Sequence, residues 1–502
     1  MKNKKFEIID ENIELQPHQI KAIEFITSRK NSCINYETGQ GKTLISLESM
    51  FRLFANDEIE KALVVCTKSS ILSFEEDILK TDYNPKNLVI IKSVKDLEEL
   101  NKLDKQIFII QYETLLSISL IDLMRAFKAF KSGLFIDEVH RVKTAGSFTK
   151  GGKSKQSLTA ISLNKLKTSF IYLVGLTATT ITSELIDGYR VLNFISPGTL
   201  GGLKWFQKNF CVYEEASRYV PKLRKYLTYH KLLRYKNLDG FLKYTKNIMI
   251  QYFPKLNYKF HVLSKSLEPG SKRALKYEEL AALTHGRNNN MHSSIMPRLH
   301  RLVDKSPAKR FLLNKLIDRH RNDGLIVYTR TRKGDMIEYI QQILEAKDLE
   351  VKVISGSTKK DKRKEIKNWA FEGSPSNKAL IITDAAGQSM NLEFTHNLIF
   401  WEIPMGIGKF LQLKGRIGRM SSKWPQFDFY FLLIKNTIDE YFYLKFTSNK
   451  EMMKFTGSDI AIPQSKMNMF DERKLKRERD SKMWCKENNN ENRIKKNIRR
   501  LK

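Results

Sequence analysis

A glycine-bearing turn near the start of the chain has the residue types of a phosphate-binding loop. Gly39-Gln40-Gly41-Lys42-Thr43 follows the apolar run 33–36 and precedes a helix-like segment. Glycines let a backbone come close to phosphate, and the first N–H groups of a helix attract anions. Lys42 is suited to neutralise β- and γ-phosphates, and the Thr43 hydroxyl to ligate Mg²⁺. The strict loop pattern requires glycine where Tyr36 stands, so an incidental turn is the alternative.

Two adjacent carboxylates further along the chain could complete such a site. Asp137 and Glu138 follow the apolar run 134–136. Asp137 is placed to hold Mg²⁺, directly or through water, and Glu138 to polarise the water that attacks a γ-phosphate. An isolated Asp-Glu pair is commonly a surface feature. Together with a phosphate loop, the pair favours metal-assisted hydrolysis of a nucleoside triphosphate, because the dication offsets the repulsion between the carboxylates.

A third candidate group lies in the segment 412–419, which contains Gln412, Arg416 and Arg419. The two arginines are three positions apart, so on a helix they share one face and both can reach a polyphosphate. An arginine supplied to the γ-phosphate by a second domain accelerates hydrolysis by about 10³–10⁵-fold. Hydrolysis would then depend on closure of an interdomain cleft, and this motion would carry the domains along nucleic acid. Two solvated arginines on a basic helix are the alternative.

These groups need a scaffold that brings distant segments together, and hydrophobic patterning predicts an α/β fold. Short β-rich runs bounded by polar residues alternate with helix-like segments, as is typical of buried parallel strands. The runs lie at 62–66, 107–110, 134–136 and 171–174, and then at 325–328, 351–354, 379–382 and 398–400. Between about residues 200 and 307 this pattern lapses. We therefore expect two parallel-sheet lobes with a largely helical insertion between them.

Composition and patterning together predict four regions. They are an N-terminal ATP-binding lobe at 1–200, a basic helical insertion or linker at 201–306, a C-terminal lobe at 307–460 and a basic tail at 461–502. The tail is rich in charged residues and asparagine, which indicates a mobile or loosely helical extension. With 502 residues, 41% of them hydrophobic, the chain has material for at least two cores, which excludes a mainly disordered protein.

The charge balance favours a polyanionic partner. Lys and Arg number 88 against 55 Asp and Glu, for a formal net charge of +33. Nucleic acid is the commonest such partner, although a merely soluble basic protein is the alternative on charge alone. Between Glu215 and Asp239 there is no acidic residue, and tyrosines that could stack on bases alternate with basic residues that include Arg218, Lys222, Arg224 and Lys225. The alternative is an amphipathic helix whose tyrosines lie in the core.

Other features exclude some protein classes. Mean hydropathy is −0.42, and no apolar run approaches the ~20 residues of a spanning helix, so no membrane partner is expected. The N-terminus has no apolar segment like that of a secretory signal. Four cysteines (Cys33, Cys66, Cys211 and Cys485) lie far apart, without zinc-site spacing and too few for a disulfide scaffold. We expect reduced thiols and an intracellular protein.

The chain resembles the superfamily 2 helicases, specifically their Swi/Snf-like translocase branch, over residues 13–455. Asp137-Glu138-Val139-His140-Arg141-Val142-Lys143 is the sharpest branch marker, whereas Thr177-Ala178-Thr179-Thr180 replaces the branch's usual Thr-Gly-Thr-Pro. The segments that resemble the family's motifs occur in its order: 15–19 (Q motif), 37–43 (I), 63–72 (Ia), 109–115 (Ib), 137–143 (II), 175–179 (III), 325–330 (IV), 383–392 (V) and 412–419 (VI). Each fragment is weak alone, but the ordered set is highly specific.

The resemblance implies two RecA-like lobes, with ATP and Mg²⁺ bound between them. Gln19 would read the adenine edge, and Arg416 and Arg419 would act on the γ-phosphate. The other residues that would contact the nucleotide are Thr38, Gly39, Gln40, Gly41, Lys42, Thr43 and Gln412. Those that would couple the nucleotide state to domain closure are Thr177, Thr179, Gly387 and Asn391, and those that would contact nucleic acid are Lys68, Ser69 and Thr383.

The favoured interpretation is an ATP-dependent DNA helicase or double-strand translocase that remodels branched or protein-bound DNA, including recombination or replication intermediates. An RNA-directed or transcription-coupled NTPase is the first alternative. A catalytically silent nucleic-acid scaffold is the second, and the intact Lys42, Glu138 and Arg416 argue against it. The Asn- and Lys-rich composition hints at an AT-rich genome. A small stand-alone motor of this kind suits a phage or other virus, which would place the protein in the cytoplasm of a bacterial host.

Overall fold

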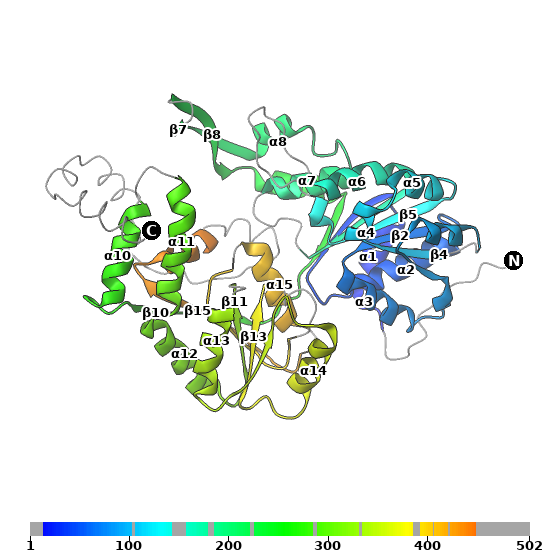
Figure 1. Cartoon of the computed structure of the whole chain (residues 1–502). Coiled ribbons are helices and arrows are strands. Elements are labelled where there is room, and N and C mark those ends of the chain that lie inside the picture. Colours follow the sequence, from blue (N-terminus) through cyan, green and yellow to red (C-terminus); the bar gives the residue numbers. More distant parts are fainter. Residues whose placement is uncertain are drawn as a thin grey trace.

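The computed structural model describes residues 14–102, 106–142, 157–178, 185–220, 225–284, 289–330, 334–384, 392–404, 406–419 and 422–447. Within these residues, two sheets covered by helices form two lobes, and a two-stranded hairpin projects from them (Figure 1). Every pairing within the two larger sheets is parallel. The expected fold of two parallel-sheet α/β lobes is therefore confirmed.

The first sheet has seven strands in the order β3-β4-β2-β5-β6-β1-β9. Its strands are β1 (Asn31–Tyr36), β2 (Lys61–Cys66), β3 (Leu88–Ile91), β4 (Gln106–Gln111), β5 (Ser132–Asp137), β6 (Tyr172–Thr177) and β9 (Met249–Tyr252). The helices of this lobe are α1 (Pro17–Thr27), α2 (Lys42–Ala55), α3 (Lys68–Ile78), α4 (Tyr112–Ser117), α5 (Leu120–Lys128), α6 (Leu158–Leu166) and α7 (Leu185–Ile195). Apolar runs such as Leu63–Val65 are wholly buried, as expected for strands covered on both faces.

The second sheet has six strands in the order β10-β15-β14-β11-β13-β12. Its strands are β10 (Tyr258–Ser266), β11 (Leu325–Thr329), β12 (Glu350–Ile354), β13 (Lys378–Thr383), β14 (Asn397–Phe400) and β15 (Phe427–Lys435). The helices that follow β10 are α10 (Lys272–Thr284), α11 (Asn289–Asp304), α12 (Pro307–His320), α13 (Gly334–Glu345), α14 (Lys360–Phe371), α15 (Ile407–Ile417) and α16 (Ile438–Thr447). All eight runs predicted as strands are strands. Among the strands of the two larger sheets, β3, β9, β10 and β15 were not predicted.

The described residues of the segment 201–306 form four helices, but the segment is not helical throughout. Its helices are α8 (Leu203–Phe210), α9 (Leu238–Thr245), α10 and α11, while β7 (Cys211–Val220) and β8 (Lys225–Tyr235) form an antiparallel hairpin. The alternative of an amphipathic helix between residues 215 and 239 is therefore wrong for the hairpin residues. Alternating tyrosines and long basic side chains suit a two-residue strand period, which explains the difference.

The chain crosses between the sheets inside this same segment. β9 pairs with β1 of the first sheet, and β10 pairs with β15 of the second. The crossing therefore lies between Tyr252 and Tyr258, inside the segment 201–306 that was expected to be an insertion or linker. Short strands such as β9 carry little pattern of their own, because their burial depends on the neighbour that they join.

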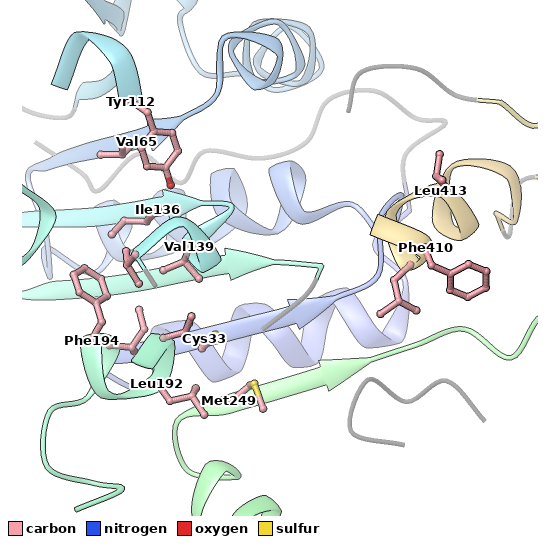
Figure 2. Close-up of a cluster of buried hydrophobic side chains, with 14 of the residues drawn as sticks. Cys33, Val65, Tyr112, Ile136, Val139, Leu192, Phe194, Met249, Phe410 and Leu413 are labelled. Atoms are coloured by element: carbon pink, nitrogen blue, oxygen red, sulfur yellow. The ribbon is translucent and has the colours of Figure 1, made fainter. Parts of the chain in front are cut away.

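Apolar packing continues from one lobe to the other. One cluster of buried side chains includes Cys33, Ile136 and Val139 of the first lobe together with Phe410 and Leu413 of α15. Figure 2 shows α15 on the side toward which the strands of the first sheet point. In the part of the chain that the structure describes, no helix is long and apolar enough to span a membrane.

Candidate nucleotide-binding site

Three candidate segments meet at one edge of the first sheet. Tyr36, Asp137 and Thr177 are the last residues of β1, β5 and β6. Because β6 lies between β1 and β5 and all three run parallel, their carboxyl ends share one edge. The fold thus brings the phosphate loop, the acidic pair and Thr177 to one edge of the first sheet.

The phosphate loop connects β1 to α2 and has the conformation that its glycines allow. Gly39 and Gly41 have φ angles of 86° and 74°, in the left-handed region that side-chain-bearing residues rarely adopt. A Cβ on Gly41 would collide with the side-chain amide of Gln19. Lys42 is the first residue of α2, so the helix N-terminus faces the loop and offers free N–H groups to an anion.

Lys42 is held inside the loop by backbone carbonyls. Its Nζ donates hydrogen bonds to the oxygens of Tyr36 at 2.9 Å and Glu37 at 3.1 Å. Burial lowers the pKa of Lys42, and the nearby charges of Glu138 and Asp137 oppose that shift. The ammonium group therefore lies within the loop and near the acidic pair, in place to contact a bound phosphate.

The Q-motif segment fastens the loop from the other side. The side-chain amide of Gln19 donates to the carbonyl of Gln40 at 3.3 Å, and its Oε1 accepts from the N–H of Gln16 at 2.9 Å. The hydroxyl of Tyr36 donates to the carbonyl of His18 at 2.7 Å. Tyr36 thus replaces the usual glycine without opening the site, because it is buried and joins the loop to α1.

A pair of stacked rings beside the loop was not predicted. The rings of His18 and Tyr252 lie 3.9 Å apart with an interplanar angle of 4°. Burial lowers the pKa of His18, which favours the neutral imidazole. Tyr252 belongs to β9, a strand with no recognisable sequence pattern, so only the pairing of β9 with β1 reveals this contact.

The two carboxylates at the end of β5 are fixed by different partners. Ser70 donates its hydroxyl to Oδ2 of Asp137 at 2.7 Å, and the N–H of Glu138 donates to Oδ1 at 3.0 Å. Burial raises the pKa of Asp137, and the charge of Glu138 adds to that rise. Glu138 has a φ of 54°, a left-handed conformation that turns its side chain away from the strand direction.

His140 connects the acidic pair to Thr177 at the end of β6. Its Nδ1 lies 3.2 Å from Oε2 of Glu138 and 3.0 Å from Oγ1 of Thr177. Burial by itself would raise the pKa of Glu138, but His140 and the charges of Lys42 and Arg416 lower it to about 2. Glu138 is therefore ionised at neutral pH and able to accept a hydrogen bond from water. His140 was not predicted as a partner of Glu138 or Thr177.

The arginines of the second lobe face this site. An ideal Cβ on Gly39 would lie 3.2 Å from Cζ and Nε of Arg419, so the guanidinium packs directly on the phosphate loop. Burial lowers the pKa of Arg416 to about 10; the charge of Arg419 adds to the shift, while Glu138 and Asp137 oppose it. Burial also lowers the pKa of Arg419, against the charge of Glu393. Arg416 therefore lies near the acidic pair of the first lobe, and Arg419 lies against its phosphate loop.

Motif VI also contacts the loop through two residues that were not predicted. Nζ of Lys414 lies 3.1 Å from Oε1 of Glu37, and a Cβ on Gly415 would lie 3.1 Å from Cβ of Thr38. Gln412 is half-buried on the same helix, α15. A lysine and a glutamate in two different motifs give no sequence signal for pairing, because only the packing of the lobes brings them together.

The remaining predicted residues are placed as follows. Thr43 is half-buried in the first turn of α2, and Lys68 is exposed at the start of α3. Thr383 is the last residue of β13 and is buried, so nucleic acid could reach it only after a rearrangement. Ser69, Arg218 and Lys225 lie in α3, β7 and β8, with side chains that are not described. Thr179, Lys222, Arg224, Gly387 and Asn391 lie outside the described residues.

Two protein-family models match the chain, one on each lobe. Residues 12–182 match "Type III restriction enzyme, res subunit", and residues 308–421 match "Helicase conserved C-terminal domain". A solved structure, the "Sulfolobus solfataricus SWI2/SNF2 ATPase core in complex with dsDNA", is similar over 91% of this chain and 96% of that chain, with 18% sequence identity and a TM-score of 0.40.

Curated relatives differ in how much of their own length is matched. The DNA repair protein rhp54 of Schizosaccharomyces pombe is 27% identical over 39% of this chain and 24% of that protein. The uncharacterized ATP-dependent helicase YqhH of Bacillus subtilis is 23% identical over 91% of this chain and 82% of that protein. The nuclear protein STH1/NPS1 of Saccharomyces cerevisiae is 23% identical over 82% of this chain and 32% of that protein. The two family models, matched in order on the two lobes, identify the chain as a superfamily 2 helicase, and its relatives show that it is similar to Swi/Snf-like proteins.

Proposed function

We propose that the protein is a DNA-dependent ATPase that couples ATP hydrolysis to translocation along double-stranded or branched DNA. The contact of Arg419 with Gly39 carries this proposal, because it places a charge from one lobe on the phosphate loop of the other. Hydrolysis that requires both lobes makes each turnover a cycle of closure and reopening. Motion of two DNA-bound lobes in such a cycle is translocation.

In this proposal the bound nucleotide lies between the loop and α15. Gln19 contacts the adenine, Lys42 and the loop N–H groups hold the β- and γ-phosphates, and Arg416 and Arg419 stabilise charge that develops on the γ-phosphate. Glu138, ionised at neutral pH, orients and polarises the attacking water. Because the arginines stabilise the transition state more than bound ATP, they act on the rate rather than on affinity.

The residues present also suit Mg²⁺, the ion that accompanies ATP in such sites. Thr43 and Asp137 offer the hydroxyl and carboxylate oxygens that this hard cation prefers. Burial and the charge of Glu138 raise the pKa of Asp137, and a bound dication would favour its ionised form. Bound Mg²⁺ would neutralise phosphate charge and orient the γ-phosphate.

Three features support DNA as the partner. The net charge of +33 favours a polyanion, and backbone contacts to phosphate require no sequence reading. The hairpin β7–β8 projects from the lobes (Figure 1), and from residue 216 to its end it contains no acidic residue. The relative rhp54 is named as a DNA repair protein, which suggests action on recombination or replication intermediates.

A nucleic-acid panel tests the proposal. ATP hydrolysis with Mg²⁺ is measured without nucleic acid and with linear duplex, four-way DNA, single strands and RNA, with Lys42→Ala as the inactive control. We expect stimulation of at least about tenfold by duplex or branched DNA, because nucleic acid favours the closed state. Stimulation by RNA alone would favour the RNA-directed alternative, and turnover no greater than that of Lys42→Ala would favour the silent scaffold.

A further inference from the structure

We propose that the second lobe carries a binding site for a divalent transition-metal ion of the zinc type, formed by His320, Asp323 and His396. One possible ligand atom of each residue lies within 4.8 Å of the others. Two imidazoles and a carboxylate, with water in the fourth position, are a common zinc-binding set. The site is independent of the nucleotide, because His396 precedes the amino end of β14, whereas α15 follows its carboxyl end.

One ligand pair already has nearly the required spacing. Nδ1 of His320 lies 3.7 Å from Oδ2 of Asp323. Ligand atoms at about 2.0–2.2 Å from a tetrahedral zinc ion lie roughly 3.3–3.6 Å from one another. Since the three ligand atoms lie within 4.8 Å, a side-chain shift of about 1 Å at His396 would complete the set. Such a shift is small for a side chain that lies just before the first residue of a strand.

One ring nitrogen of each histidine is in place to act as a ligand. Nε2 of His320 is hydrogen-bonded to the hydroxyl of Tyr430 at 2.7 Å, which leaves Nδ1 to face Asp323. Nε2 of His396 lies 4.0 Å from Oδ2 of Asp428, while its Nδ1 is buried without a hydrogen-bond partner among the described residues. The hydrogen bond between His320 and Tyr430 is of the kind that a metal-binding histidine commonly makes through its other ring nitrogen.

Asp428 acts as support rather than as a ligand. His261 contacts its Oδ1 at 2.7 Å, and the side-chain amide of Gln426 donates to Oδ2 at 2.8 Å. The ring of Trp424 packs against that of His396, with centroids 4.5 Å apart. The orientation of His396 is therefore held by neighbours that a metal need not displace.

A second cluster in the same lobe shows why charge matters here. His300, Asp304 and Glu402 also bring three possible ligand atoms within 4.8 Å. Its carboxylates, however, already have cations, since Lys309 lies 2.7 Å from Asp304 and Arg330 lies 3.4 Å from Glu402. Asp323, by contrast, forms no ion pair with a lysine or arginine of the described part of the chain, so it can accept a metal ion.

A bound ion would join segments that are distant in sequence. His320 is the last residue of α12, and His396 immediately precedes β14. Closing a long loop through a metal stabilises the folded state, because the site does not exist in the unfolded chain. We therefore expect the ion to stabilise the second lobe without taking part in ATP hydrolysis.

Metal titration of the full chain tests this site. Protein stripped with chelator is titrated with Zn²⁺ and with Co²⁺, whose visible absorption reports tetrahedral coordination. The variants are Asp323→Asn and His396→Asn, and the matched control is Asp318→Asn. Asp318 is on the same helix and pairs with Lys347 at 2.9 Å, outside the cluster. Circular dichroism of each variant verifies the fold.

We expect one equivalent of metal in the wild type and the control, with a melting temperature that rises on binding. Affinity should fall at least about tenfold in Asp323→Asn and His396→Asn, and the rise in melting temperature should disappear. Asp323 is at the surface end of the cluster, so its variant tests the site even where His396→Asn folds poorly. Absence of binding in the wild type, or equal binding in Asp323→Asn, would overturn the proposal.

Discussion

Glu37 of the phosphate loop and Lys414 of α15 form a buried ion pair between the two lobes. Their Oε1 and Nζ atoms lie 3.1 Å apart, and the side chains are only 4% and 3% exposed. Burial raises the pKa of Glu37, whereas the charges of Lys414 and Lys42 oppose that shift. Lys414 also lies 4.5 Å from the ring centroid of Tyr258. The pair therefore holds motif VI against motif I.

Breaking this pair from one side should impair closure more than removing both charges. A lone buried charge costs about 3–5 kcal/mol, whereas a neutral replacement of both partners can be nearly free. We expect Lys414→Met to lower kcat at least about tenfold, and Glu37→Gln/Lys414→Met to recover most of that loss. Steady-state ATPase assays and a double-mutant cycle measure the coupling.

The matched control is Lys362→Met, which removes a lysine from an exposed pair. Lys362 and Glu365 lie 3.1 Å apart with side chains that are 57% and 63% exposed, so the loss should be small. Equal impairment of the single and double variants would show that the side-chain shapes, not the charges, hold the lobes together.

Glu138→Gln should separate nucleotide binding from hydrolysis. The amide retains the shape of the side chain but cannot polarise water as a carboxylate does, so we expect hydrolysis to fall by about 10²–10⁴-fold. The affinity for ATP should change little, because Lys42 and the loop remain intact. Equilibrium binding of a fluorescent ATP analogue beside single-turnover hydrolysis measures both quantities. Loss of ATP binding would instead assign Glu138 a structural role.

Arg419→Lys should reduce the rate while leaving ATP affinity within a few-fold. A lysine keeps one positive charge but loses the planar fork that spans phosphate oxygens. Given the contact with Gly39, we expect kcat to fall by about 10³-fold, at the low end for an arginine finger. Arg321→Lys, at a side chain 43% exposed, is the control. An equal effect in both variants, or a change confined to KM, would contradict the assignment.

His140→Asn should change how activity depends on pH. His140 helps to lower the pKa of Glu138 to about 2, so its removal should raise that pKa toward the ordinary value of 4.5 or above. The acidic limb of the kcat profile should then move to higher pH, because the ionised carboxylate is the active form. ATPase profiles that extend from neutral pH down to about pH 4.5, the ordinary value for a glutamate, measure the shift.

The same substitution should also change how the stability of the folded protein depends on pH. A carboxylate with a lowered pKa stabilises the folded state above pH 4.5, and this contribution is lost as the pH falls toward about 2. In His140→Asn, the free energy of unfolding should therefore fall less steeply as the pH is lowered between these two values. An unchanged acid transition together with an unchanged kcat profile would show that His140 does not act through Glu138.

The sequence alone determined the local chemistry and its order. Strand runs such as 62–66 and 325–328, the glycines of the phosphate loop and the Asp137-Glu138 pair are each specified by neighbours in sequence, because hydrophobic patterning and backbone conformation are local properties. The spacing of Arg416 and Arg419 predicted one shared helix face, but α15 ends between them at Ile417, so Arg419 follows the helix. Local pattern did not reveal the hairpin β7–β8 or the short strand β9.

Only the tertiary structure decided which of these groups meet. Parallel strands bring Asp137 and Thr177 to one edge, and packing of the lobes places Arg419 on Gly39 and Lys414 on Glu37. His140, and the cluster of His320 with His396, likewise owe their partners to chain segments far apart in sequence. Contacts between distant segments depend on the summed burial and pairing of the whole fold, and therefore leave no periodic trace in the sequence.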